Sequence, residues 1–553
     1  MHHTGHQPCS HVGLLSIRIS DADWTGFCPY LEKKRSYGQF FFDFLAHISK
    51  KNGDMGNFLL IFLPISALFC NFAPKQYMVM NRIIARTNEI KSLERMYRSG
   101  KSEFIIVYGR RRIGKTFLIN NLFADRFTFS FVGSRKQKQA IQLQRFASQL
   151  KYYSGSQYAP ALNSWEEAFN ELRVLIERRP AEERKVIFID EMPWIDTPHS
   201  AFVEALEYFW NAWAAQRTDI LFIACGSATS WMVNMLVKNQ GGLHNRITEQ
   251  IYLRPFRLGE CEEYLHDMGC MWDKYSILQC YMAMGGVPYY MSLLNPEQSL
   301  AQNIDRLFFV KNAPLREEFE ELFNALFNQA DKYIAVISAL AGRREGMLRA
   351  EIMEKTKLSG GSLTKILNNL ERCDFIETYA RFNSSVRNTF YRISDPYTLF
   401  YFKFLHNTNT KDEHWWTNNL HSHSVEAWQG FSFETICMTH IEQIKQRLGI
   451  SGIATTTSCW RKLGDSSSRG TQIDLVIDRA DRIINLCEMK FAEGPYSITK
   501  DYEEKLRNRM AIFREDTKTK KSLVTTMVTT YGVARGIHSG VVQSEVLMDD
   551  LFA

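Results

Sequence analysis

Residues 103–116 read EFIIVYGRRRIGKT, and the fold assignment starts from this stretch. Glu103 to Val107 is a short apolar run rich in β-branched residues, the pattern of a buried parallel strand. GRRRIGKT follows at 109–116 and matches GxxxxGK[ST], and the next residues, FLINNLF, have helical spacing. Strand, glycine loop and helix in this order predict a P-loop on an α/β fold with a parallel sheet.

Each part of this loop has a chemical role. Gly109 and Gly114 let the backbone wrap closely, so that N–H groups point at phosphate oxygens, and the following helix adds its positive N-terminal end. Lys115 is expected to reach the β- and γ-phosphates, and Thr116 to ligate Mg²⁺. The residues expected to bind nucleotide are Gly109, Arg110, Arg111, Arg112, Ile113, Gly114, Lys115, Thr116 and Phe117. The predicted cofactors are therefore ATP and Mg²⁺.

A pair of acids follows later in the chain. Lys185 to Glu191 reads KVIFIDE, an apolar strand that ends in two carboxylates. Asp190 is expected to hold Mg²⁺ through water, and Glu191 to polarise the attacking water. Taken alone, the pair also fits two acids that cap a strand next to a turn at Pro193. Together with the P-loop, it favours hydrolysis of ATP.

Two further polar residues follow the next strands. Ser227 comes two residues after the apolar run Ile220 to Cys225, where it can sense the γ-phosphate from the neighbouring strand. Serine after a strand is also a common helix N-cap, and both interpretations stay open. Arg246 lies before the strand Glu249 to Leu253. It can act on the phosphates in cis or on a neighbouring subunit, or it can be a solvated surface arginine.

The order of several motifs resembles the archaeal-type ATPases, P-loop proteins of the AAA+/STAND group. The motifs are GRRRIGKT, FIDEMPW at 188–194, CGS at 225–227, LRPF at 253–256 and GGVPYYM at 285–291. The resemblance covers residues 80 to 490. It implies a five-stranded parallel αβα core over 80–257, followed by a helical lid over 258–329. Pro288 is expected in the first turn of a lid helix. Ala85 departs from the Gly-Arg-Glu pattern of the family, which leaves the contribution of Arg86 to adenine or ribose binding open.

The first 79 residues do not fit this pattern. Their apolar stretch at 58–72, FLLIFLPISALFCNF, is shorter than the roughly 20 residues of a spanning helix and contains Pro64. We therefore expect residues 1–79 to be a non-native or disordered extension, with the natural start at Met78 or Met80. A membrane anchor and a real extra element stay open as alternatives, but no stable membrane insertion is expected.

Residues 330–395 have the pattern of a winged helix-turn-helix, with two alternating segments that form the wing. Helices are predicted over Lys332–Leu340, Leu348–Lys355 and Ser362–Arg372. The third helix is the candidate recognition element for DNA. Lys365 is its only base apart from Arg372, although Arg381 and Arg387 lie in the wing. Because tight DNA binding usually neutralises several phosphates, a protein-interaction spacer stays open as the alternative.

Two strands are predicted in residues 396–553. Gln472 to Asp478 reads QIDLVID, and Ile483 to Phe491 reads IINLCEMKF. Glu488 and Lys490 are two positions apart in the second strand, so both side chains leave the same face. Helices are predicted over Trp428–Ile444 and Ile498–Phe513.

These elements carry a constellation of acids and a lysine. Its members are Glu434 on the first helix, Asp474 on the first strand, and Glu488 and Lys490 on the second. Three carboxylates can bind Mg²⁺ or Mn²⁺, with Asp474 and Glu488 as the expected ligands, and the lysine can position water and stabilise a pentavalent phosphate. The pattern resembles the PD-(D/E)xK nuclease fold, a restriction-endonuclease-like α/β domain that archaeal-type ATPases often carry here as a DUF234-type domain. Acidic strand ends and an exposed Glu/Lys pair are the common alternative, and such a fold can lack activity.

Composition limits the class of protein. A chain of 553 residues is too long for one core, and 45% hydrophobic and 23% charged residues are typical of soluble globular proteins. The net charge of +7 permits nucleic acid as a partner without arguing for it. Eleven cysteines without CxxC pairs fit reduced thiols, so a cytoplasmic location is expected.

Two functions from different classes remain. The first is a Mg²⁺-dependent ATPase that couples turnover to action on nucleic acid, through the winged helix and the nuclease-like module. The second is an ATP-dependent molecular switch whose C-terminal modules bind a protein partner or a second copy of the chain. The complete acid and lysine set favours the first function, and the modest basic footprint favours the second.

Overall fold

The computed structural model describes residues 82–227, 231–237, 243, 246–383, 389–406, 408, 411–462 and 470–553. These residues belong to one compact unit, Arg82–Ala553. The expected extension over 1–79, with its apolar stretch at 58–72, lies outside the described residues, as does Arg387. In the described part of the chain, no helix is both long and apolar enough to cross a membrane.

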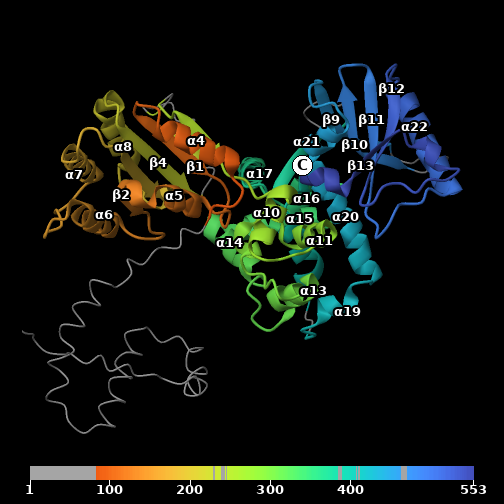
Figure 1. Ribbon diagram of the computed structural model, residues 1–553, viewed down its shortest axis with the longest axis horizontal. Helices are drawn as coiled ribbons and strands as arrows, with labels where there is room; N and C mark the ends of the chain where they lie inside the picture. The colour runs from red at the N-terminus through yellow and green to blue at the C-terminus, as the bar shows by residue number, and fades with distance from the viewer. Residues whose placement is uncertain are drawn as a thin grey trace, which may run out of the picture. The chain divides into compact units, whose positions relative to one another are not determined.

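A five-stranded sheet with the order β2-β3-β4-β1-β5 forms the first part of the fold (Figure 1). Its strands are β1 (Glu103–Tyr108), β2 (Phe127–Val132), β3 (Lys185–Asp190), β4 (Ile220–Gly226) and β5 (Glu249–Tyr252). All neighbouring strands pair in parallel, which confirms the predicted α/β fold with a parallel sheet. β3 and β4 are buried along their whole length, as strands covered on both faces should be.

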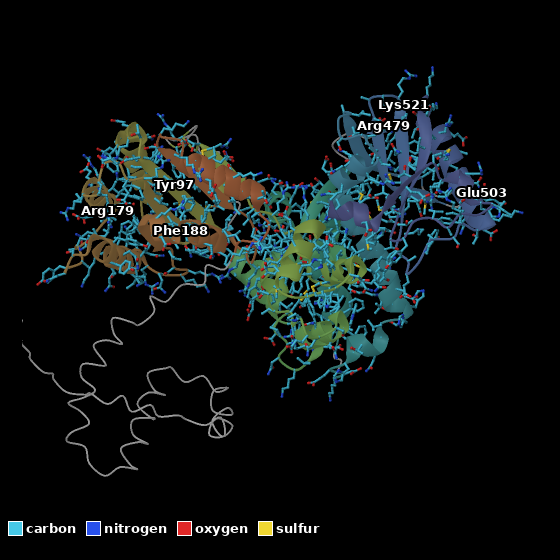
Figure 2. All side chains as sticks on the ribbon, viewed as in Figure 1. Tyr97, Arg179, Phe188, Arg479, Glu503 and Lys521 are labelled. Carbon is cyan, nitrogen blue, oxygen red and sulfur yellow. The ribbon has the colours of Figure 1, made fainter. Side chains whose placement is uncertain are left out.

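Helices cover both faces of this sheet. They are α4 (Thr87–Tyr97), α5 (Lys115–Phe123), α6 (Gln139–Ser154), α7 (Trp165–Glu177) and α8 (Phe202–Ala212). Phe104 and Ile106 of β1 pack into a cluster with α6, α7 and α8, whereas Ile105 and Val107 pack into a second cluster with α4 and α5. Phe188 of β3, labelled in Figure 2, belongs to the second cluster. Since successive strand side chains point to opposite faces, the sheet is the middle layer of three.

Helices follow the sheet over the range expected for a lid. They are α10 (Leu258–Asp267), α11 (Lys274–Met284), α12 (Pro288–Met291), α13 (Leu300–Ile304) and α14 (Glu318–Leu326), with a π-helical turn at Asp305–Phe309. α12 begins at Pro288 as predicted, because the first helical position does not need the N–H that proline lacks.

Three helices and a small antiparallel sheet occupy the region interpreted as a winged helix. They are α15 (Ala330–Ala341), α16 (Arg349–Thr356) and α17 (Gly360–Arg372), and β6 (Met347–Leu348), β7 (Ile376–Ala380) and β8 (Thr389–Ile393) in the order β6-β8-β7. The sequence pattern missed β6, whose two residues pair with β8. The winged-helix interpretation and a DNA contact stay predictions.

A second five-stranded sheet, with the order β13-β12-β11-β10-β9, lies in the last part of the chain. Its strands are β9 (Thr455–Lys462), β10 (Thr471–Arg479), β11 (Ile483–Lys490), β12 (Ser522–Thr529) and β13 (Ser544–Leu547). β9, β10 and β11 pair antiparallel, and β11, β12 and β13 pair in parallel. Lys521 joins the ends of two strands by donating to Asp478 at 2.5 Å and to the carbonyl of Arg479 at 2.8 Å (Figure 2). The nuclease-like fold stays a prediction.

The helices of this last part differ from the prediction at one point. They are α18 (Pro396–Phe400) with a π-helical continuation at Tyr401–Leu405, α19 (Trp415–Asn419), α20 (His423–Thr439), α21 (Ile441–Arg447) and α22 (Lys500–Thr517). The single helix predicted over Trp428–Ile444 is wrong, because the chain leaves the helix at His440 (φ −115°, ψ 31°). The ring of His440 accepts a hydrogen bond from Leu258 N at 3.3 Å, which holds the break against α10.

One hydrophobic cluster is continuous from the lid helices to the end of the chain. It includes Leu258, Ile337, Tyr397 and Phe552. The predicted domain boundaries after residues 329 and 395 therefore cross a shared core, and the division into separate domains stays a prediction.

Candidate functional site

The carboxyl end of β1 leads directly into the P-loop. Gly109 has a φ of +147°, and a Cβ at this position would lie 2.2 Å from the carbonyl oxygen of Leu253. Gly114 has a φ of +86° and precedes α5. Both glycines predicted to shape the loop therefore have backbone conformations that other residues rarely adopt.

Lys115 folds back over its own loop. Its Nζ donates to the carbonyl oxygens of Gly109 (3.1 Å) and Arg110 (2.8 Å), and to Ser227 Oγ (3.0 Å). The side chain is buried, and this burial lowers the pKa of the ammonium group, although nearby acidic groups oppose the shift. Three hydrogen bonds thus fix the position of the Lys115 ammonium group.

Thr116 and Asp190 lie side by side next to Lys115. Thr116 Oγ1 donates to Asp190 Oδ2 at 2.6 Å, and Asp190 Oδ1 accepts from Glu191 N at 2.8 Å. A hydroxyl and a carboxylate are oxygen ligands of the kind that Mg²⁺ prefers. The residues present therefore fit a Mg²⁺ ion bound with the phosphates of a nucleotide.

Glu191 and Ser227 come together from neighbouring strand ends. The backbone of Glu191 has a φ of +45°, which is unusual for a residue with a Cβ. Ser227 Oγ donates to Glu191 Oε1 at 2.9 Å, while Trp194 Nε1 donates to Oε2 at 3.0 Å. Because Ser227 Oγ also accepts from Lys115, the serine connects the lysine to the glutamate.

The three arginines of the loop have different surroundings. Arg110 is fully buried, and its Nη1 donates to Asp395 at 2.6 Å. Arg112 donates to Glu318 through Nε (3.1 Å) and Nη2 (3.0 Å), and Arg111 is exposed. No sequence pattern identified the two acids, which are 285 and 206 residues away from their partners.

Three further residues predicted to act in the site, Ile113, Phe117 and Arg246, lie in different surroundings. Ile113 is buried in the cluster beneath α4 and α5, whereas Phe117 is 42% exposed. Arg246 is exposed in the turn before β5. Its backbone N–H donates to the carbonyl of Leu243 at 3.1 Å.

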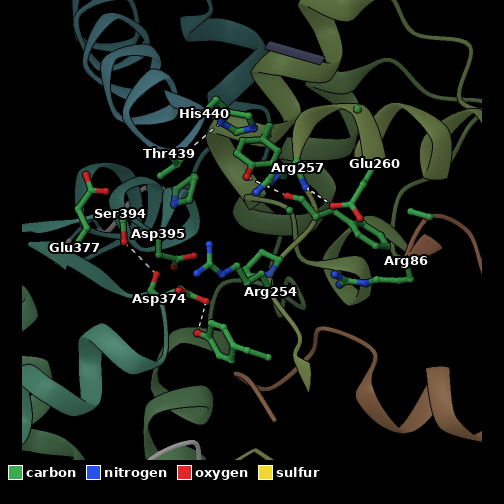
Figure 3. Close-up of a pocket in the computed structure, with 18 of the residues that line it drawn as sticks. Arg86, Arg254, Arg257, Glu260, Asp374, Glu377, Ser394, Asp395, Thr439 and His440 are labelled. Carbon is green, nitrogen blue, oxygen red and sulfur yellow. Dashed lines mark hydrogen bonds between the residues drawn. The ribbon is translucent and has the colours of Figure 1, made fainter. Parts of the chain in front are cut away.

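A cavity of about 1030 Å³ is lined by Tyr108 at the end of β1 but by no residue of Gly109–Thr116 (Figure 3). Its walls come from the start of α4, the β5–α10 connection, the α17–β7 turn, the α20–α21 junction and the end of the chain. Arg86 stacks on Phe256, 4.4 Å from the ring centroid, and donates to the carbonyl of Ile113 at 3.3 Å. Asp374 and Asp395 lie on the side of the cavity away from Arg86 (Figure 3).

In the last part of the chain, Glu488 is surrounded by donors. Lys490 Nζ lies 2.7 Å from Glu488 Oε1, so the two residues meet on one face of β11 as predicted from their spacing. Tyr502 of α22 donates to Oε1 at 2.6 Å, and Arg509 of the same helix pairs with Oε2. The sequence pattern singled out neither Tyr502 nor Arg509.

Glu434 and Asp474 are electrostatically coupled to this group. Burial, together with the nearby Asp474 carboxylate, raises the pKa of Glu434 to about 7. Burial also raises the pKa of Asp474. Burial acts in the same direction on Glu488, but Lys490 and Arg509 outweigh it and hold the pKa of Glu488 below its ordinary value.

Three carboxylates of this cluster were expected to bind a metal ion. In the part of the chain that the structure describes, no three Asp, Glu, His or Cys side chains are arranged to hold a metal ion. The reason is local, since both oxygens of Glu488 accept hydrogen bonds from cationic or phenolic groups. Asp474 and Glu488 as metal ligands therefore stay a prediction.

Comparisons with known sequences identify relatives of this site. Residues 83–294 match a family described as an ATPase domain predominantly from Archaea. An uncharacterised protein of Methanocaldococcus jannaschii is 23% identical over 396 residues, which are 71% of this chain and 83% of the relative. An uncharacterised ATP-binding protein of the same organism is 42% identical over 43 residues, which are 8% of this chain and 73% of the relative.

Solved structures resemble part of the chain. The Walker-type ATPase paby2304 of Pyrococcus abyssi has a TM-score of 0.43 and 17% identity, over 58% of this chain and 96% of that one. The ORC2 protein of Aeropyrum pernix has a TM-score of 0.37 and 14% identity, over 58% of this chain and 94% of that one.

Proposed function

We propose that this chain, whose residues 83–294 match a family described as an ATPase domain predominantly from Archaea, binds ATP at Gly109–Thr116 and hydrolyses it. The observation that carries the proposal is the hydrogen-bonded group of Lys115, Ser227 and Glu191. This group lies at the carboxyl edge of a parallel sheet, where α/β proteins bind their ligands.

Lys115 binds the terminal phosphates. When a phosphate enters the loop, Nζ exchanges the carbonyl oxygens of Gly109 and Arg110 for phosphate oxygens. The backbone N–H groups of the loop and the N-terminal end of α5 supply the remaining donors. Because Lys115 is buried, its charge acts on the phosphates with little screening by water.

Thr116 and Asp190 hold the Mg²⁺ ion that accompanies the nucleotide. When bound, this ion neutralises charge on the β- and γ-phosphates. The hydroxyl of Thr116 and the carboxylate of Asp190, which share a hydrogen bond in this structure, would be the groups that hold the ion.

Glu191 orients the attacking water and accepts its proton. In the structure its carboxylate is engaged by Ser227 and Trp194, so it must be released before it can bind water. Ser227 is placed to control that release, because the same Oγ contacts Lys115. A γ-phosphate that draws Lys115 and Ser227 towards itself frees Glu191 for catalysis.

The adenosine end of the nucleotide extends into the cavity beside Arg86. The contact of Arg86 with the carbonyl of Ile113 joins this cavity to the P-loop. The guanidinium of Arg86 and the ring of Phe256 stack on each other and are both buried, so the pair forms a fixed wall of this cavity.

Phosphate release from ATP tests the proposed function. Purified wild-type protein with Mg²⁺ should release phosphate, and Lys115→Ala should lose both nucleotide binding and turnover. Lys101→Ala is the matched control, because the Lys101 side chain is 70% exposed and pairs with Glu103. Normal turnover by Lys115→Ala would show that hydrolysis occurs elsewhere.

Action on nucleic acid is a second candidate function. The observation that favours it is the half-buried cluster in which Lys490 pairs with Glu488 at 2.7 Å and the carboxylates of Asp474 and Glu488 both act on the pKa of Glu434. Arg392, which is buried in β8, also acts on Glu434 and Asp474, so the region interpreted as a winged helix contributes a cation to this cluster.

A cleavage assay distinguishes this function from a molecular switch. Single- and double-stranded DNA are incubated with ATP and Mn²⁺, next to a Glu488→Ala/Lys490→Ala variant. Cleavage by the wild type alone would assign the activity to the cluster. Cleavage by neither protein would favour C-terminal modules that bind a protein partner.

A further inference from the structure

Arg110 takes part in two contacts at once. Its carbonyl oxygen accepts from Lys115 Nζ at 2.8 Å, and its guanidinium donates to Asp395 at 2.6 Å. Asp395 is the N-cap of α18, where its Oδ2 accepts from Thr398 N at 2.9 Å. One residue of the P-loop therefore joins the phosphate-binding lysine to the start of a helix 285 residues away.

This ion pair is buried but incompletely satisfied. Arg110 is 0% exposed, yet its Nε and Nη2 find no hydrogen-bond partner among the described residues. The ring of Phe375 lies 4.6 Å from the guanidinium carbon and adds a cation–π contact. Since buried donors without acceptors cost free energy, a small shift of the loop can change the stability of this contact appreciably.

A second arginine ties the same loop to the lid helices. Arg112 holds Glu318 through two hydrogen bonds, and Glu318 also accepts from Tyr290 OH at 3.2 Å. The carbonyl of Arg112 accepts from Tyr289 N at 3.3 Å. The P-loop is therefore held by side chains from outside the parallel sheet on two sides.

We propose that the Arg110–Asp395 ion pair couples the nucleotide state of the P-loop to the packing of Pro396–Leu405. The inference rests on the proposed binding of ATP at this loop. A phosphate takes Lys115 from the carbonyl of Arg110, so the backbone of Arg110 readjusts while Asp395 holds its guanidinium. Because coupling between two sites is reciprocal, a change in the packing of α18 alters nucleotide affinity by the same factor.

Hydrogen exchange of the full-length protein tests this coupling. The probe is AMP-PNP with Mg²⁺, which binds without turnover, and its affinity is measured in parallel by calorimetry. In the wild type, AMP-PNP is expected to change amide exchange in residues 396–405 by about fivefold or more, together with exchange in the P-loop.

Asp395→Asn separates the ion pair from the helix cap. Asparagine caps helices as well as aspartate does, so α18 keeps its N-terminal hydrogen bond while Arg110 loses its counter-ion. Asp273→Asn is the matched control, because Asp273 caps α11 in the same way through Ser276 N at 2.9 Å. The response of residues 396–405 is expected to vanish in Asp395→Asn and to persist in Asp273→Asn.

A second variant covers the case in which the unpaired Arg110 prevents folding. Arg110→Met/Asp395→Asn removes both charges, and asparagine keeps the N-terminal hydrogen bond of α18. In this double variant too, AMP-PNP is expected to leave amide exchange in residues 396–405 unchanged. A response that persists in either variant would overturn the coupling, and so would an unchanged segment in wild-type protein saturated with AMP-PNP. Wild-type protein that fails to bind AMP-PNP would overturn the proposed ATPase function, and the coupling with it.

Discussion

At the scale of single residues, close backbone contacts make some positions far less tolerant than others. Gly109→Ala places a methyl group 2.2 Å from the Leu253 carbonyl oxygen, at a φ of +147°. It is expected to lower the free energy of unfolding by about 3 kcal/mol and to weaken nucleotide binding. Gly155→Ala is the control, with a φ of +67° and no atom within 4 Å of the new methyl. Its expected cost is about 1 kcal/mol in a urea titration. Equal losses in the two variants would be inconsistent with the contact at Leu253.

Glu434 illustrates how burial affects the pH dependence of stability. Its pKa of about 7 lies above the ordinary value of 4.5, so the folded protein holds an extra proton between these two pH values. The free energy of unfolding therefore falls as pH rises through this window. Glu434→Gln removes the ionisable carboxyl group, and with it this loss of stability at high pH. It is expected to be more stable than the wild type at pH 8, by up to about 3 kcal/mol, and similar to it at pH 4.

Urea titrations at the two pH values measure this difference. Glu442→Gln serves as the control, because the Glu442 side chain is 67% exposed. A Glu434→Gln variant that gains no stability at pH 8 would mean that the carboxyl group is not held in a buried, acid-rich environment.

At the scale of elements, the junction between α10 and α20 depends on a neutral histidine. Burial lowers the pKa of His440 to about 4, and Nε2 accepts from Leu258 N while Nδ1 lies 2.8 Å from the Ile436 carbonyl. Between pH 4 and the ordinary value of 6.5, the unfolded chain binds more protons than the folded one. The stability from this group is therefore complete above pH 6.5 and is lost as pH falls towards 4.

The His440→Gln variant tests this junction. The wild type is expected to lose up to about 3 kcal/mol more than the variant when the pH falls from 7 to 4. His421→Gln, at a position whose side chain is 81% exposed, should behave like the wild type. Parallel stability curves for wild type and His440→Gln would rule out a buried, neutral His440.

The local sequence pattern predicted strands β1, β3 and β4, but it did not predict β9 or the helix break at His440. β1, β3 and β4 are continuous apolar runs because helices cover both faces of their sheet, so the sequence alone identifies them. β9 reads TTTSCWRK and is only partly buried, so it lacks the clear alternation that marks a strand. The break at His440 depends on a contact with Leu258, far away in the chain, and no local rule encodes it.

At the scale of the whole molecule, a bound nucleotide should stabilise the fold by mass action. ATP that binds only the folded protein is expected to raise its stability by about 2.7 kcal/mol at a concentration of about 100 times Kd. Lys115→Ala should show no such gain, because its phosphate contacts are lost. Thermal melts with Mg²⁺ and increasing ATP measure the effect. An equal gain in both proteins would indicate that ATP binds away from the P-loop.

The sequence predicted which polar residues lie at the carboxyl ends of β1 and β3 but not the contacts that surround them. Lys115, Asp190 and Glu191 could be predicted because each belongs to a short motif that directly follows or ends an apolar strand. Asp395 and Glu318 lie in other parts of the chain, and only the three-dimensional arrangement brings them to the P-loop. Tyr502 and Arg509 lie on α22, and they too are brought to Glu488 only by the three-dimensional arrangement.

The hydrolytic role of the loop from Gly109 to Thr116 is tested most directly by measuring ATP binding and phosphate release together in Glu191→Gln. Glutamine retains the shape of the side chain and its contact with Ser227 but cannot accept the proton of water. The variant is expected to bind ATP with nearly wild-type affinity and to release phosphate about 100-fold more slowly or worse. Wild-type turnover by Glu191→Gln would contradict the assignment of this site as the centre of ATP hydrolysis.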